Sequence, residues 1–160
     1  MSAYWKYFLY IIEHKLNVFI ECWREGLYLQ AFTHDISKFH PVEFFPYARK
    51  FYSNKKVDEV EWQKAWLHHQ HHNKHHWNYW VVDQVKREAV PIPRKYIFEM
   101  ICDYRSLSRK WGRKRTDTNI SERLILNLQT EKVILHPDTR RECEFFIRKM
   151  KMENKNSKAT

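Results

Sequence analysis

The sequence predicts an all-α protein built as a single domain. The chain has 160 residues, a length typical of one domain that buries its own hydrophobic core. It holds only two glycines, too few for the many tight turns of a β-sandwich or barrel. Aromatic residues make up 16% of the chain, which excludes a disordered protein, and apolar residues recur with helical spacing. We therefore expect six or seven helices over residues 1–152, followed by a polar tail at 153–160.

Charge and cysteine content indicate which class of partner the protein binds and in which cellular compartment it works. Lys and Arg outnumber Asp and Glu by 29 to 19, which gives a net charge of +10. This balance predicts an anionic partner: nucleic acid, a nucleotide, another phosphate-bearing small molecule or an acidic lipid surface. The three cysteines form no CxxC pair, so we expect reduced thiols in a cytoplasmic protein. No apolar run is long enough for a membrane span, and the sequence leaves the oligomeric state open.

The first helix is expected over residues 3–25, because Gly26 is a common C-terminal stop. This segment carries two apolar stripes at helical spacing. One stripe consists of Trp5, Leu9, Ile12, Leu16, Phe19 and Trp23, and the other of Tyr7, Phe8, Ile11, Val18 and Cys22. A helix that is apolar on two sides is predicted to lie at the centre of a fold.

Prolines and capping residues place the next three helices. The second is expected over residues 27–39, because Pro41 cannot continue it. Pro41 instead opens a third helix over residues 42–52. Asp58 is a favourable N-cap for a long fourth helix, which we expect to run through Trp80.

The second half of the chain begins with a turn-rich segment. Residues 81–93 hold two prolines and alternating valines, which predicts either a small hairpin or a loop. A fifth helix is expected over residues 94–111, ended near Gly112, and a sixth over about 119–135. Pro137 can start a seventh helix that reaches about residue 152.

The most informative local motif is His34-Asp35-Ile36-Ser37-Lys38. Adjacent side chains on a helix point about 100° apart, so His34 and Asp35 can both reach a cation held between helices. A neutral imidazole with a carboxylate suits Fe, Mn, Zn or Co better than Ca. Lys38 shares the helix face of Asp35 and could hold a substrate anion beside the metal. The alternative is an ordinary surface pair or helix cap.

The order of His14, the His34-Asp35 pair, a histidine cluster and Asp103 resembles that of the HD superfamily of metal-dependent phosphohydrolases. His34-Asp35-x-x-Lys38 also resembles a segment of its two-metal members, which include cyclic-dinucleotide phosphodiesterases and a group of di-iron oxygenases. The whole chain is similar to a family of small, uncharacterised bacterial and phage proteins. The resemblance implies an HD-like helical domain in which His14, His34, Asp35 and Asp103 bind a first metal ion. Two further histidines would bind a second ion, bridged by Asp35.

Six histidines lie close together in the predicted fourth helix and are candidates for those two ligands: His68, His69, His71, His72, His75 and His76. At 100° per residue, His69 and His76 share one stripe with Trp62, Trp66, Trp77 and Trp80, so we favour them as the inward pair.

Seven residues of straight helix rise by about 10 Å, which is too far for this pair to share one small ion. Either the helix breaks near Asn73-Lys74, or one of the pair serves the substrate instead. On an unbroken helix, His72 with His75 or His76 would suit one ion better. The alternative for the whole cluster is a surface histidine tract.

Charged residues near the motif could complete the site. Arg105 and Arg109 belong to a run of six cations that ends at residue 115, and with Lys38 they are candidates to bind phosphate. A solvated helix end is the alternative for this run. Glu43 could orient His34 or a bound water, or be an ordinary carboxylate near a helix start.

These observations predict a metal-dependent phosphohydrolase acting on a nucleotide or another phosphate ester. Asp35 and Lys38 would be the catalytic residues, and one or two divalent transition-metal ions would activate water, with Fe or Mn favoured and Zn, Co or Ni alternatives. Two other functions remain open from the sequence. The same ligands would suit a di-iron oxygenase, and a basic, aromatic-rich helical protein could simply bind nucleic acid or a protein partner.

Overall fold

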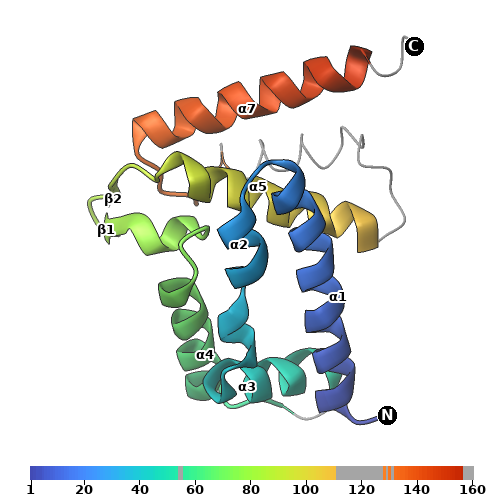
Figure 1. Cartoon of the computed structure of the whole chain (residues 1–160). Coiled ribbons are helices and arrows are strands. Elements are labelled where there is room, and N and C mark those ends of the chain that lie inside the picture. The colour runs from blue at the N-terminus through green and yellow to red at the C-terminus, as the bar shows by residue number, and fades with distance from the viewer. Residues whose placement is uncertain (54–55, 111–127, 129, 131, 157–160) are drawn as a thin grey trace. The chain divides into compact units, whose positions relative to one another are not determined.

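The structure is a computed structural model that describes residues 1–53, 56–110, 128, 130 and 132–156, and its fold is all-α apart from two short strands (Figure 1). The chain divides into two compact units, residues 1–74 and 75–160, which are described separately. No helix in the described ranges is long and apolar enough to cross a membrane.

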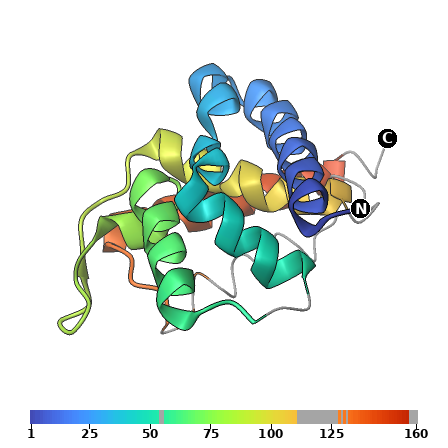
Figure 2. The same ribbon diagram turned by 90° about the horizontal axis from the view of Figure 1, so that it is seen from below.

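The first unit contains α1 (Ala3–Arg24), α2 (Tyr28–Thr33), the 3-10 helix η1 (Ile36–Phe39), α3 (Pro41–Tyr52) and α4 (Glu59–His72). α1 packs against α2 and α3, and α3 also packs against α4, so that α3 joins the two sides of the unit (Figures 1 and 2). Tyr7 and Ile11 of α1, Tyr47 and Ala48 of α3, and Ala65 of α4 form its hydrophobic core.

α1 buries one of its two apolar stripes and exposes most of the other. Ser2 caps its start by accepting a hydrogen bond from the backbone of Trp5. Ile11 and Val18, from the second stripe, are fully buried. Leu16 and Trp23, from the first stripe, are about half exposed, at 59% and 49%. The prediction that this helix lies at the centre of the fold is therefore wrong for most of the first stripe. Among the described residues, α2 covers that stripe only in part, where Phe32 contacts the rings of Phe19 and Trp23.

The second predicted helix is interrupted at the His34-Asp35 pair. α2 ends at Thr33, and Asp35 adopts a left-handed backbone conformation with φ 51° before η1 begins at Ile36. Asp is one of the few residues other than Gly that tolerate this conformation. The expectation of one helix through Phe39 is wrong, because the left-handed residue breaks the helical hydrogen-bond ladder at this point.

α4 ends earlier than predicted, at His72, because Asn73 adopts an extended backbone. The Asn73 side chain donates hydrogen bonds to the backbone carbonyl of His69 and to Ser37 Oγ, each at 2.7 Å. The expectation of a continuous helix to Trp80 is therefore wrong. The break falls near Asn73-Lys74, one of the two alternatives that the spacing of His69 and His76 left open.

The second unit contains η2 (Trp77–Trp80), β1 (Val81–Asp83), β2 (Glu88–Ala89), α5 (Arg94–Lys110) and α7 (Pro137–Asn156). β1 and β2 form the small antiparallel hairpin that was one of two predictions for this segment. α5 and α7 pack against each other through a core that includes Ile97, Ile101, Cys143 and Phe146. α7 continues to Asn156, four residues beyond the expected end, into the predicted tail.

The predicted sixth helix lies mainly outside the described residues. At its expected end only Leu128 is helical, and the described residues from Thr130 to His136 form a bend, a turn and irregular chain. The expectation that this helix reaches Leu135 is therefore wrong. The chain instead leads directly into α7, which begins at Pro137.

The left-handed backbone of Gly26 ends α1, and a substitution there tests this. It has φ +74°, and its N–H and that of Leu27 bond the carbonyls of Trp23 and Cys22, which satisfies the end of the helix. An added Cβ would meet no atom within 4 Å, so only backbone strain opposes a side chain. We expect Gly26→Ala to lower the free energy of unfolding by about 1–2 kcal/mol in urea denaturation. Gly26→Asn should cost less, and an unchanged Gly26→Ala midpoint would contradict this account.

Candidate metal centre

The break between α2 and η1 turns the side chains of His34 and Asp35 into the first unit, where both are 1% exposed. The Lys15 ammonium on α1 donates hydrogen bonds to the carbonyls of Phe32 and His34, at the end of α2. A cation at this position satisfies carbonyls that a helix end leaves without partners. This contact ties the His34-Asp35 turn to α1.

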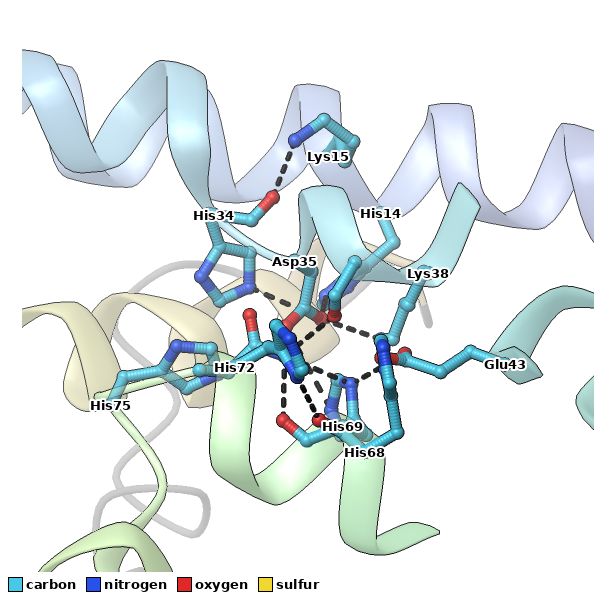
Figure 3. A network of polar contacts seen from close by, with 12 residues as sticks. His14, Lys15, His34, Asp35, Lys38, Glu43, His68, His69, His72 and His75 are labelled. Carbon is cyan, nitrogen blue, oxygen red and sulfur yellow. Dashed lines mark hydrogen bonds and ion pairs between the residues drawn. The ribbon is translucent and has the colours of Figure 1, made fainter. Parts of the chain in front are cut away.

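Four side chains from three helices and the turn approach the Asp35 carboxylate (Figure 3). Lys38 Nζ lies 2.6 Å from Asp35 Oδ2, and the Nε2 atoms of His14 and His34 lie 3.3 and 3.5 Å from the same oxygen. His69 Nε2 of α4 lies 3.8 Å from Oδ1. A carboxylate this deeply buried needs such compensation, because transfer of an isolated charge from water is costly.

His14, His34 and Asp35 could hold a metal ion. Each offers a ligand atom, these atoms lie within 4.8 Å of one another, and all three residues are buried. Two imidazole nitrogens and one carboxylate form a donor set that transition metals use in proteins. Lys38 Nζ contacts the same Oδ2 atom that both histidines face, so a bound ion would share this carboxylate with the lysine.

Glu43 forms a second buried carboxylate, 0% exposed, on α3. Its two oxygens lie 2.6 Å from His68 Nδ1 and 2.9 Å from His69 Nδ1. Burial opposes ionisation of Glu43, but hydrogen bonds from His69 and His68 outweigh burial and lower its pKa. An ionised carboxylate only accepts hydrogen bonds, so His69 donates from Nδ1 to Glu43, and its Nε2 atom faces Asp35. Glu43 thus orients a candidate ligand, although that ligand is His69 and not the expected His34.

Ser37 and Asn73 belong to the same polar network but were not identified from the sequence. Asn73 bonds Ser37 Oγ and also contacts His69 Nδ1 at 3.1 Å. The helical phase that places His69 inward also places Asn73 on that stripe, so a signal for Asn73 was present. Ser37 had no such signal, because its position depends on the left-handed turn at Asp35.

A cavity of about 420 Å³ lies beside the cluster and is lined by Tyr7, Tyr10, Lys38, Tyr47, Phe51 and Tyr52. Burial, together with the nearby Glu43 and Asp35 carboxylates, raises the pKa of Tyr7 and Tyr47 well above the ordinary tyrosine value. Both phenols therefore stay protonated at neutral pH and can donate hydrogen bonds. The sequence indicated Tyr7 only as part of an apolar stripe.

The structure brings together five of the predicted site residues in the first unit: His14, His34, Asp35, Lys38 and His69. His71 and His72 are exposed on the same helix. The second unit contains His76, Asp103 and Arg105, so their roles stay predictions. The helical phase that placed His76 beside His69 does not apply, because α4 ends at His72. The Arg109 side chain and residues 111–115 lie outside the described part of the chain.

The second unit contains a further buried histidine-carboxylate pair. His75 Nδ1 lies 3.2 Å from Glu99 Oε1 on α5, with the two residues 2% and 5% exposed. The geometry shows that Glu99 pairs with His75, a member of the histidine cluster.

The fold and the site together define the class of this protein: an all-α protein with a buried His-Asp cluster that could hold a metal ion. The chain belongs to a family described as Family of unknown function (DUF5662), whose model matches residues 3–149. No curated protein and no solved structure matches it.

Glu43 makes the stability of the first unit depend on pH. The pKa of Glu43 in the folded protein lies below the ordinary value of 4.5. Its contribution to the free energy of unfolding is therefore fully present above pH 4.5 and is lost as the pH falls through the folded pKa. We expect Glu43→Gln to lower the free energy of unfolding at pH 7 by roughly 2 kcal/mol, since bonds to charged groups contribute about 1.5–3 kcal/mol. The difference from wild type, measured by urea denaturation, should shrink on acidification below pH 4.5.

The matched control is Glu59→Gln, at an exposed position of α4, which should change the free energy of unfolding by less than about 0.5 kcal/mol. A Glu43→Gln loss that is no larger than the control, or that grows as the pH falls, would contradict the assigned network.

Proposed function

We propose that this protein is a metal-dependent phosphohydrolase acting on a nucleotide or another phosphate ester. The observation that carries the proposal is the convergence of His14, His34 and Lys38 on the Asp35 carboxylate. The candidate metal ligands and the ammonium that would bind the substrate phosphate therefore both contact the Asp35 side chain. The resemblance of the His34-Asp35-x-x-Lys38 motif to the HD superfamily supports the same activity.

His14, His34 and Asp35 would hold the metal, with His69 available for a second ion. Mixed nitrogen and oxygen donors favour Fe or Mn, with Zn, Co or Ni as alternatives. When bound, such an ion lowers the pKa of water and neutralises charge on a phosphate. In the reaction a water oxygen forms a bond to phosphorus, the phosphorus–oxygen ester bond breaks, and the leaving alcohol takes up a proton.

Lys38 supplies the anion-binding group of the proposed site. Its ammonium is largely buried and also borders the cavity, so a phosphate there would meet a positive charge that water screens weakly. Asp35 keeps this ammonium in place, and η1 fixes the backbone of Lys38 one turn away from Asp35. Glu43 and Asn73 hold His69 in a defined orientation, which reduces the reorganisation that binding requires.

The first test measures metal and turnover in the same preparations. The purified protein is expected to retain a transition metal by mass spectrometry and to release phosphate from nucleotides when supplied with Mn or Fe. His14→Ala, His34→Ala and Asp35→Asn should each lower metal affinity by more than about tenfold, as losses in a metal's ligand environment do. Asp35→Asn is informative because Asn also tolerates the left-handed backbone.

The matched control is His71→Ala, which removes an exposed histidine of the same tract and should leave metal content and turnover unchanged. Equal metal loss in the control would identify an adventitious surface tract. A wild-type protein that holds no transition metal and hydrolyses no phosphate ester would refute the proposal.

An iron-dependent oxygenase is the second candidate, since two histidines and one carboxylate are also the donor set of non-haem iron oxygenases. Oxygen consumption by the iron-loaded protein, with no phosphate released, would favour this function instead.

A second prediction separates Lys38 from the metal ligands. Lys38→Met removes the ammonium but keeps a side chain of similar length, and should lower kcat/KM for a phosphate ester by about 10- to 100-fold. Metal content should remain, because Lys38 is not a ligand, and Lys38→Arg should restore part of the activity. Steady-state kinetics with metal analysis measure this, and an unchanged kcat/KM would remove Lys38 from the site.

A further inference from the structure

Three histidine rings stack on one another in the first unit, outside the cluster around Asp35. The ring of His68, on α4, stacks with those of His40 and His72, with ring centroids 4.7 and 3.9 Å apart. His40 and His72 are exposed, and His68 is partly buried. These imidazoles are therefore accessible to a ligand from solvent, unlike the buried His14 and His34.

His68 and His72 have the spacing of a helical metal site. They lie four residues apart on α4, which ends at His72, so their side chains share one face of the helix (Figure 3). Two histidines at this spacing on a helix hold zinc in the H-E-x-x-H motif. The sequence repeats this spacing at His71 and His75, but α4 ends before His75. Within α4, His68 and His72 are therefore the histidine pair with this spacing.

Hydrogen bonds orient both rings as they do in metal-binding histidines. His68 Nδ1 lies 2.6 Å from Glu43 Oε1, and His72 Nδ1 lies 2.8 Å from the backbone carbonyl oxygen of His68. A carbonyl oxygen and an ionised carboxylate only accept, so each Nδ1 donates. A metal-binding histidine commonly donates its other ring nitrogen to a carboxylate or a backbone carbonyl in this way.

The Nε2 atoms of the same two rings are the positions left for an ion. Among the described residues, neither Nε2 atom makes a hydrogen bond or an ion pair. A neutral imidazole that donates from Nδ1 carries its lone pair on Nε2. Because the centroids are 3.9 Å apart and χ2 of histidine is a broad torsion, a small rotation lets both rings face one ion.

His40 supports this pair without the same potential as a ligand. Its Nδ1 accepts a hydrogen bond from the backbone N–H of Val42 at 3.3 Å, at the start of α3. A neutral imidazole that accepts at Nδ1 carries its proton on Nε2, which then has no lone pair for a metal. The His40 ring instead covers part of His68 and restricts how far that ring can turn.

We propose that His68 and His72 form a second transition-metal site, which binds one Zn²⁺ or Cu²⁺ ion through their Nε2 atoms and leaves the remaining coordination positions to water. Imidazole donors suit Zn and Cu, whereas the mixed donors around Asp35 favour Fe or Mn. The two sites differ in their supporting group, since Glu43 orients His68. This inference goes beyond the proposed function, because the site binds an ion whether or not the protein hydrolyses a phosphate ester.

The test titrates the full-length, chelator-treated protein with ZnCl₂ and follows binding by calorimetry. His72→Ala removes an exposed side chain and should either lose one equivalent of Zn²⁺ or bind it more weakly by more than about tenfold, a loss at least as large as that from removing a supporting group. His68→Gln, whose amide can still donate to Glu43, should lose the same equivalent. The matched control is His71→Ala, at an exposed histidine of the same helix, which should bind as wild type does.

Nitrogen-15 NMR of the imidazole rings identifies the ligand atoms directly. Addition of Zn²⁺ should move the Nε2 resonances of His68 and His72 and leave those of His71 in place. Equal movement of all three residues, or equal loss of Zn²⁺ in His71→Ala and His72→Ala, would show a histidine tract without a defined site and overturn the proposal. A lost equivalent of one ion per two chains would show an ion that bridges two copies, which would also overturn it.

Failure of the proposed function gives a different result. A protein that releases no phosphate with any metal, but loses one equivalent of Zn²⁺ in His72→Ala, retains this site without the hydrolase activity. A protein that hydrolyses phosphate esters, and whose Zn²⁺ binding is the same in wild type and His72→Ala, retains the hydrolase activity without this site.

Discussion

The burial of the Asp35 carboxylate is the constraint on which the rest of the first unit depends. A charge that is 1% exposed is stable only when positive or hydrogen-bonding groups surround it. His14 comes from α1, Lys38 from η1 and His69 from α4, so three elements must be held in place around one residue. The hydrophobic contacts of α1, α3 and α4 through Tyr7, Tyr47 and Ala65 supply that rigidity.

A second carboxylate extends this arrangement. Glu43 accepts hydrogen bonds from His68 and His69, so His69 lies between two acidic groups, with Nδ1 toward Glu43 and Nε2 toward Asp35. Histidine ligands of metals commonly donate a hydrogen bond from their other ring nitrogen to a carboxylate in this way. The support comes from α3, which also supplies Tyr47 to the aromatic cavity. One helix therefore orients a candidate ligand and forms a wall of the cavity beside Lys38.

The sequence predicted most helices from apolar spacing, prolines and caps, and it predicted His14, His34, Asp35 and Lys38 as candidate site residues, which the structure places close together. It did not predict the breaks. Helical periodicity continues through His34-Asp35 and through Asn73, whereas several of the groups that compensate the breaks come from distant parts of the chain. Lys15 satisfies the end of α2 from α1, and Ser37 accepts the hydrogen bond of Asn73. No local pattern contains those contacts, so periodicity alone extended both helices too far.

The sequence by itself determined the all-α class and the residue types that could hold a metal, because helical periodicity and ligand chemistry are local properties. The tertiary structure decided which of the candidates in the first unit meet. It placed His69, which helical phase already favoured, beside Asp35, assigned Glu43 as its hydrogen-bond acceptor, and gathered Tyr7 and Tyr47 around a cavity beside Lys38. The physical reason is that side chains 20 to 40 residues apart come together only when the core packs, and burial then makes their charges and hydroxyl groups depend on one another.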